Sequence, residues 1–247
     1  MMAKTTMSQL KAVIFGAIGS ITETSDLQRQ AFNTAFQTAG LDWHWDLHTY
    51  RDLLKINGGQ NRLRAYRDAI YANVTDATIT ELHQAKTAAY VAMLDGTSVR
   101  ETLTPRAGVV ELINTCNDNE IQVALCTSTD LANVEGLRSA LARSLSFDRF
   151  ATIVTIDKIN QPKPAPDAYL YCLQQLGVNA DQVIAIEDTP VSLAAAKAAK
   201  IQTIATPGAT TSDQDFAAAD LVLPNLTGIT LDRLSALLNS QIPAYAS

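Results

Sequence analysis

Six short runs of apolar, mostly β-branched residues recur along this chain, with helical patterns between them. They lie at residues 12–15, 121–125, 151–154, 183–186, 202–205 and 221–223. Strands that alternate with helices form βαβ units, in which the strands pair in parallel and are covered on both faces. The sequence therefore predicts an α/β fold with a doubly wound parallel sheet.

The alternation breaks once, between about residues 24 and 95, where the pattern is helical throughout. The first helix there has an apolar face that includes Phe32 and Phe36, with Thr24 or Ser25 as its N-cap and Gly40 just past its end. Further helical stretches follow at residues 46–55, 60–71 and 76–94. Because the first strand finds partners only after residue 100, we expect a discontinuous core, residues 1–22 and 97–247, and an inserted helical cap, residues 23–96.

Composition excludes several classes of function. The net charge is −6 and Lys and Arg form no cluster, which argues against a nucleic-acid-binding protein. The three cysteines, Cys116, Cys126 and Cys172, match neither a zinc site nor a disulfide framework, so we expect buried thiols and a cytoplasmic protein. The first ten residues lack the apolar region of a signal peptide, and no window is long and apolar enough to span a membrane.

Polar side chains follow the predicted strands at the edge where parallel sheets bind ligands. After the second strand come Thr127 and Ser128, with Thr129, Asp130 and then a helix. Hydroxyl groups and free N–H groups before a helix suit a phosphate oxygen. The alternative is that Ser128, Thr129 or Asp130 only caps that helix.

Lys163 lies in a stretch with prolines at positions 162, 164 and 166, just before a predicted helix. A lysine on a stiff loop is a well-placed point charge for phosphate, although an ordinary surface lysine has the same local sequence. Glu187 and Asp188 end the fourth strand. Paired carboxylates there are costly to bury unless they meet Mg²⁺ or a lysine; in the alternative, Asp188 or Thr189 merely caps the next helix.

A hydroxyl turn, a lysine between prolines and an acidic pair, in this order after the opening segment from Phe15 to Ser20, resemble the haloacid dehalogenase superfamily. The position and helical character of the insertion resemble its β-phosphoglucomutase-like branch, which implies a Rossmann-like core. Segments 28–33, 40–46 and 58–62 are most similar to bacterial sugar-bisphosphate phosphatases associated with the Calvin cycle. That resemblance implies that Arg62, with Gly58 and Gly59, holds the distal phosphate of a sugar; a solvated loop arginine is the alternative.

The resemblance also shows what this chain lacks. The family's nucleophilic aspartate would stand at Gly16, and its acid/base aspartate at Ile18. Glycine and isoleucine can supply neither role. With one anionic ligand gone, we expect Mg²⁺ at Glu187 and Asp188 to be weak or absent, and Lys163 to turn toward Asp188. Ser20 and Thr127 keep their phosphate-holding positions, whereas Gln28 and Gln60 stand where a histidine and a lysine are common.

Three functions remain open at this stage. The first is a protein that binds a small phosphorylated metabolite, such as a sugar phosphate, without aspartyl-phosphate chemistry. The second is a working phosphomonoester hydrolase in which Asp188, Glu187, Ser20 or a bound water stands in; Ser20 has no histidine near it in sequence, because His44, His48 and His83 all belong to the cap. The third is an interaction protein that uses an exposed surface around Trp43 and Trp45, unless these pack between helices. The oligomeric state is left open.

Overall fold

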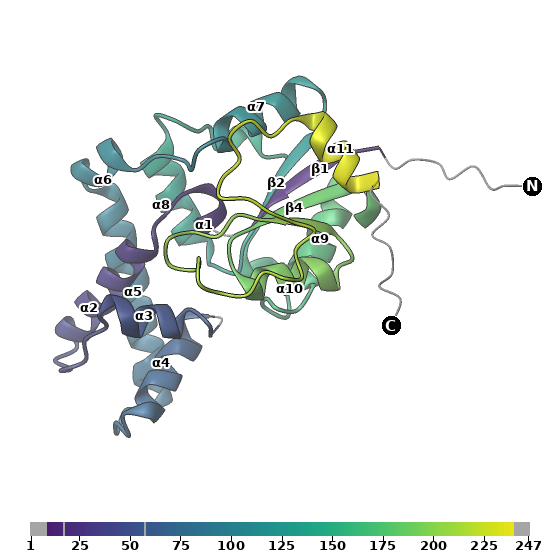
Figure 1. The fold of residues 1–247 in the computed structure, drawn as a ribbon. Coiled ribbons are helices and arrows are strands. Elements are labelled where there is room, and N and C mark those ends of the chain that lie inside the picture. Colours follow the sequence, from purple (N-terminus) through teal and green to yellow (C-terminus); the bar gives the residue numbers. More distant parts are fainter. Residues whose placement is uncertain (1–8, 17, 57, 240–247) are drawn as a thin grey trace, which may run out of the picture.

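A parallel six-stranded sheet forms the centre of the molecule (Figure 1). The computed structural model describes residues 9–16, 18–56 and 58–239. The order of the strands is β3-β2-β1-β4-β5-β6, and every neighbouring pair is parallel. The α/β prediction is confirmed, and each strand lies where its apolar run predicts it: β1 (Ala12–Phe15), β2 (Gln122–Cys126), β3 (Thr152–Val154), β4 (Val183–Glu187), β5 (Gln202–Ala205) and β6 (Leu221–Val222).

Alternate residues of the strands enter two separate cores, one on each face of the sheet. Val13 and Phe15 of β1 pack with helices α7 (Val109–Asp118), α8 (Leu131–Leu141) and α11 (Leu231–Asn239). Ala12 and Ile14 of the same strand pack with α9 (Asp167–Leu176) and α10 (Pro190–Ala198). Figure 1 shows α7 and α11 on one side of the sheet and α9 and α10 on the other. This two-sided burial explains why the strands are apolar throughout instead of alternating.

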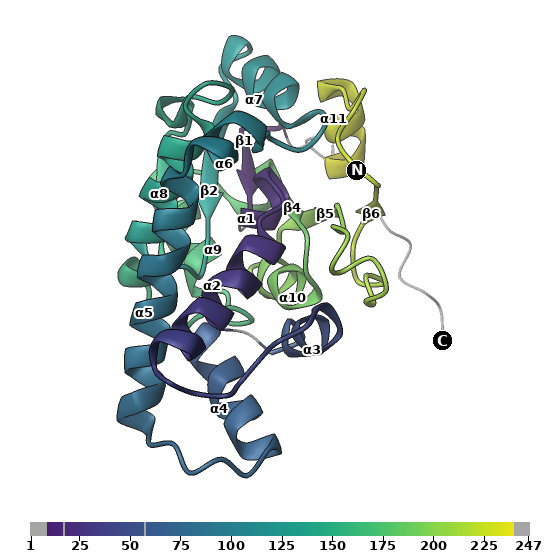
Figure 2. The same cartoon turned by 90° about the vertical axis from the view of Figure 1, so that its left-hand side faces the viewer.

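Four helices between β1 and β2, here called the helical insertion, pack together beside the sheet (Figure 2). They are α2 (Ser25–Thr38), α3 (Leu47–Leu53), α4 (Gly59–Ala69) and α5 (Asp76–Asp95). Gly40 follows α2 with a φ of +69°, as its predicted place past the helix end requires. The division into cap and core at residues 22 and 97 stays a prediction.

The helical insertion has an aromatic core of its own. Trp43 and Trp45 are 7% and 0% exposed, and they pack edge-on against Phe36 and Tyr66. Their burial agrees with packing between helices and removes the exposed aromatic surface that an interaction protein would need at this place.

Short elements connect these units. The segment after β1 is a single helical turn, α1 (Ile18–Ile21). Gly16 precedes it and extends the pairing of β1, since its N–H donates to the Ile186 carbonyl at 2.7 Å. The remaining short helices are α6 (Thr97–Thr102) and the 3₁₀ turns Phe147–Arg149, Ile156–Lys158 and Ala180–Gln182.

Two further predictions from the sequence concern the cysteines and membrane-spanning helices. All three cysteines are buried and free, as predicted, and burial raises the pKa of the Cys116 and Cys126 thiols to about 12. Among the described residues, none of the helices has the length and apolar character to cross a membrane.

Candidate functional site

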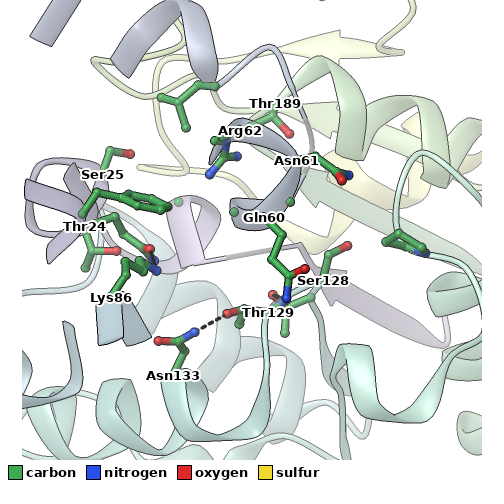
Figure 3. A pocket seen from close by; sticks show the side chains of 18 of the residues that line it. Thr24, Ser25, Gln60, Asn61, Arg62, Lys86, Ser128, Thr129, Asn133 and Thr189 are labelled. Carbon is green, nitrogen blue, oxygen red and sulfur yellow. Dashed lines mark hydrogen bonds between the residues drawn. The ribbon is translucent and has the colours of Figure 1, made fainter. Parts of the chain in front are cut away.

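A cleft of about 630 Å³ lies where the helical insertion meets the carboxyl ends of the strands (Figure 3). One side, here called the insertion wall, consists of Gly58, Gly59, Arg62, His83 and Lys86. The other, here called the sheet floor, consists of Thr127, Ser128 and Asp188, which line the cleft, with Gly16, Ser20, Lys163 and Glu187 buried beneath them. The sequence predicted that ligand-binding side chains would gather at strand ends, and the topology brings them to one edge of the sheet.

The predicted site residues fall into two groups. Six of them line the cleft: Gly58, Gly59, Arg62, Thr127, Ser128 and Asp188. Four others are not among its lining residues and lie buried beneath the floor: Gly16, Ser20, Lys163 and Glu187. The side chain of Ile18 is outside the part of the chain that the structure describes.

Lys163 and Glu187 form an ion pair below the floor. The Lys163 ammonium lies 2.7 Å from Glu187 Oε1 and donates to the Cys126 carbonyl at 3.0 Å, and the two side chains are 1% and 0% exposed. The Tyr169 hydroxyl donates to the same Glu187 oxygen. Burial lowers the pKa of Lys163, but Glu187, together with Cys126 and Asp188, more than offsets this and the pKa is raised. The prediction that Lys163 turns toward Asp188 is wrong, because the Lys163 ammonium pairs with Glu187 instead.

Glu187 fills the space that a side chain at position 16 would need. A Cβ atom on Gly16 would lie 1.9 Å from Glu187 Oε2 and 2.5 Å from Oε1. Oε2 is buried and has no hydrogen-bond partner among the described residues. Burial raises the pKa of Glu187, against the opposing effect of Lys163. The Glu187 carboxylate therefore lies directly beside the backbone of Gly16 and leaves no room there for a side chain.

Asp188 is the member of the acidic pair that faces the cleft. It is 8% exposed, and the Ser20 hydroxyl donates to its Oδ1 at 3.1 Å. A Cβ on Gly19 would lie 1.9 Å from Asp188 Oδ2, so glycine at that position makes room for the carboxylate. Burial raises the pKa of Asp188, and the Ser20 hydrogen bond only partly opposes this. Because Ser20 is 1% exposed and points to Asp188, it is poorly placed to attack a ligand.

The alternative roles in helix capping belong to neighbours of the predicted residues. Asp130 is the N-cap of α8 and accepts from the Asn133 N–H at 2.9 Å, while Asn133 in turn donates to the Thr129 hydroxyl (Figure 3). Thr189, not Asp188, caps α10. Thr127 and Ser128 are thus left at the cleft; the Thr127 hydroxyl accepts from the Thr129 N–H at 3.1 Å.

Gly58 and Gly59 line the cleft, and the local backbone and packing also require glycine at both positions. Gly58 has a φ of +85° at the start of α4, a conformation that favours glycine. A Cβ on Gly59 would lie 2.5 Å from His83 Nε2, so this glycine allows the close approach of α4 to α5. Arg62 lines the cleft, and its Nε donates to the Ile56 and Leu53 carbonyls at 2.9 and 3.2 Å. These hydrogen bonds hold the arginine side chain in place.

Lys86 and His83 line the cleft although the sequence did not single them out as site residues. Lys86 is 4% exposed, donates to the Gln28 side-chain oxygen, and lies 5.3 Å from the ring centre of Phe32 and 5.1 Å from that of Tyr90. Burial, followed by repulsion from Arg62, lowers its pKa to about 7. Burial and the Lys86 charge also lower the pKa of His83.

A sequence signal for Lys86 does exist. Ile79, Leu82, Tyr90 and Leu94 form the buried face of α5, and Lys86 lies on the same face. A charged side chain at core-facing helical spacing is uncommon and indicates a partner or a site.

Comparisons with known proteins show the family to which a chain with this fold and cleft belongs. The family model of haloacid dehalogenase-like hydrolases matches residues 10–200. The chain belongs to the haloacid dehalogenase-like hydrolases. It is 38% identical over 229 residues to Protein CbbY of Rhodobacter capsulatus, which covers 93% of this chain and 99% of that protein. It is 37% identical to the plasmid-encoded Protein CbbY of Cupriavidus necator, over 88% of this chain and 86% of that protein.

Solved structures of haloacid dehalogenase-like proteins have the same fold. CbbY from Rhodobacter sphaeroides in complex with phosphate has a TM-score of 0.82 at 33% identity, covering 89% of this chain and 96% of that one. A mutant of the same CbbY was solved with xylulose-(1,5)bisphosphate, with a TM-score of 0.81. A β-phosphoglucomutase from Clostridium difficile, at 19% identity and a TM-score of 0.77, matches in fold.

Haloacid dehalogenase-like hydrolases generally use Mg²⁺. Among the described residues, no group of three or more His, Cys, Asp or Glu side chains is placed to hold a metal ion. Of the two acidic side chains here, Glu187 already shares one oxygen with Lys163 and Tyr169, and Asp188 accepts from Ser20.

Proposed function

We propose that this protein binds a small phosphorylated metabolite, of the sugar phosphate class, in the cleft, and that it has lost the aspartyl-phosphate chemistry of its family. The observation that carries the proposal is the position of Glu187, whose carboxylate takes the space beside Gly16 and pairs with Lys163. Gly16 provides no nucleophile, and the Glu187 carboxylate fills the space that a side chain at this position would need.

Binding without this chemistry is supported by the side chains that line the cleft. Arg62 and Lys86 bring positive charge, the start of α4 at Gly58 adds the partial positive charge of a helix N-terminus, and Thr127 and Ser128 offer hydroxyl groups. The similarity to CbbY proteins, one of which was solved with xylulose-(1,5)bisphosphate, favours a sugar phosphate over other anions.

The acidic pair does not fit Mg²⁺ well. This ion demands octahedral oxygen coordination and gives up its water reluctantly. Glu187 Oε1 is committed to Lys163 and Tyr169, and no third carboxylate joins Glu187 and Asp188 among the described residues. In this proposal Lys163, in place of a metal ion, is the positive counter-ion of Glu187, and the chain binds its ligand without a metal.

A second candidate function is slow hydrolysis with Asp188 as a general base. Asp188 lines the cleft, and its raised pKa brings it closer to the working range of a base. This reaction would need water as the nucleophile, since Ser20 is buried and donates to Asp188.

Restoration of the missing carboxylates tests the proposal. The native protein and the Gly16→Asp/Ile18→Asp variant are compared for phosphatase activity on sugar phosphates with Mg²⁺, and the native protein is titrated with the same compounds by calorimetry. We expect binding to the native protein at millimolar concentration or below, and turnover in the double variant alone. Native turnover that disappears in Asp188→Ala would establish the second candidate instead, and a complete lack of binding would overturn the proposal.

A further inference from the structure

The insertion wall concentrates positive charge that is not matched by acidic groups beside it. Lys86 is bonded to an amide oxygen of Gln28, not to a carboxylate. Arg62 and Lys86 repel each other, and both lower the pKa of His83. The opposing carboxylate that acts on Lys86 and His83 is Asp130, the N-cap of α8, which also lines the cleft. An anion at this wall would relieve the repulsion that these groups now exert on one another.

The sheet floor has the opposite character. The charges of Lys163 and Glu187 cancel in an ion pair that is buried and does not line the cleft. The charged side chain that the floor presents to the cleft is Asp188, and each carboxylate of the acidic pair is harder to ionise because both are buried. Among the described residues of the floor, no cation faces the cleft. A phosphate placed here would meet the Asp188 carboxylate directly, whereas the two cations that act on Asp188, Lys163 and Arg106, do not line the cleft.

Uncharged hydrogen-bonding groups surround Asp188 at the floor. Thr127, Ser128 and Thr211 line the cleft as well, and the Thr211 hydroxyl donates to the Asp188 main-chain carbonyl at 2.8 Å. A carboxylate flanked by hydroxyl groups is a good acceptor for the hydroxyl groups of a sugar or a polyol. The two ends of the cleft therefore differ in the chemical group that each can accept.

We propose that the cleft holds the phosphate of its ligand against Arg62 and Lys86 of the insertion wall and takes an uncharged, hydroxyl-bearing end at Asp188, so that it selects sugar monophosphates over sugar bisphosphates. A pentulose bisphosphate has a phosphate at each end, so docking one against the wall leaves the other at the floor. This inference rests on the proposed function, since it states which phosphorylated ligands the site accepts.

Calorimetry in metal-free buffer with EDTA at pH 6.5, below the pKa of about 7 of Lys86, tests the selectivity, with xylulose 5-phosphate and xylulose 1,5-bisphosphate as the two probes. We expect the native protein to bind the monophosphate about 10-fold more tightly than the bisphosphate, because the second phosphate lies near Asp188. The Asp188→Asn variant removes that charge at constant shape, and its preference should shrink to about 2-fold or reverse. The Lys86→Met variant should lose about 10-fold in affinity for both probes.

Asp130→Asn is the matched control, because Asp130 is a cleft carboxylate on the side of Lys86 and its replacement keeps an N-cap side chain. It should strengthen binding of both probes by a similar factor and leave the preference unchanged. A native protein that binds the bisphosphate as tightly as the monophosphate, or more tightly, overturns the inference and leaves the proposed function standing. If neither probe binds at millimolar concentration, the proposed function itself fails.

Discussion

The two sides of the cleft handle their charges in different ways. At the sheet floor Lys163, Glu187 and Tyr169 satisfy one another below the surface, with the lysine and the carboxylate 2.7 Å apart. At the insertion wall Lys86 is also buried, but it has an amide for a partner and a like charge, Arg62, as its neighbour. Charges that pair internally support the fold, whereas charges that repel one another are available to a ligand. The buried pair of the floor is therefore part of the core, whereas the charges of the wall remain available to a ligand.

The largest effect should come from removing Lys163, the counter-ion of Glu187 beneath the floor, which tests whether this pair supports the fold. Lys163→Met should lower the free energy of unfolding by about 3–5 kcal/mol, because it leaves the Glu187 charge buried without its partner. Urea denaturation at pH 8 measures the loss. Adding Glu187→Gln to the same chain removes the stranded charge and should recover a large part of the stability. A loss of less than about 1 kcal/mol in the single variant, a value typical of exposed ion pairs, would show that the pair does not support the core.

A smaller effect is expected when a carboxylate is returned to position 16. Gly16→Asp should destabilise the protein by about 2–3 kcal/mol, because the new Cβ would lie 1.9 Å from Glu187 Oε2 and Glu187 must move away. Added Mg²⁺ should raise the melting temperature of this variant and leave that of the native protein unchanged, since a third carboxylate restores a metal site. Thermal unfolding with and without the ion is the measurement. An equal shift in both proteins would contradict the internal role of Glu187.

The smallest effect concerns the insertion wall and has the opposite sign. Lys86→Met should raise the free energy of unfolding by about 1 kcal/mol at pH 6, because an apolar side chain of similar length avoids the cost of a buried charge. The folded-state pKa of Lys86 is about 7, below its unfolded value. The folded chain therefore binds fewer protons between these two pKa values, and native stability should rise with pH across that range.

The advantage of Lys86→Met should accordingly be largest below pH 7, and it should fade and then reverse as the pH approaches 10. Urea denaturation of both proteins at pH 6, 8 and 9.5 gives the three differences. Lys55→Met is a suitable control, because Lys55 is exposed and pairs with Asp52 on the surface. A difference that does not change with pH would mean that the Lys86 amine carries no buried charge.

Much of the fold followed from the sequence, and so did part of the site. The apolar runs predicted the six strands because a sheet buried on both faces requires continuous apolar residues. Thr127 and Asp188 were found because strand ends gather at one edge of a parallel sheet. The partner of Lys163 was not predictable, since it depends on the space that Gly16 leaves and on Tyr169, a residue of α9 that looks like an ordinary core position. Lys86 could have been found from its charge on the buried face of α5, whereas His83 reaches the cleft through the packing of that helix.

The place of β1 in the sheet has a consequence for how the molecule is assembled during synthesis. Of the six strands of this sheet β1 is synthesised first, yet its neighbours are β2 and β4, which begin at residues 122 and 183. The helical insertion emerges between them and has its own aromatic core, so it can fold while β1 still waits for partners. The wall of the cleft is therefore available before the floor, and the Glu187–Lys163 pair closes only when most of the chain has been made.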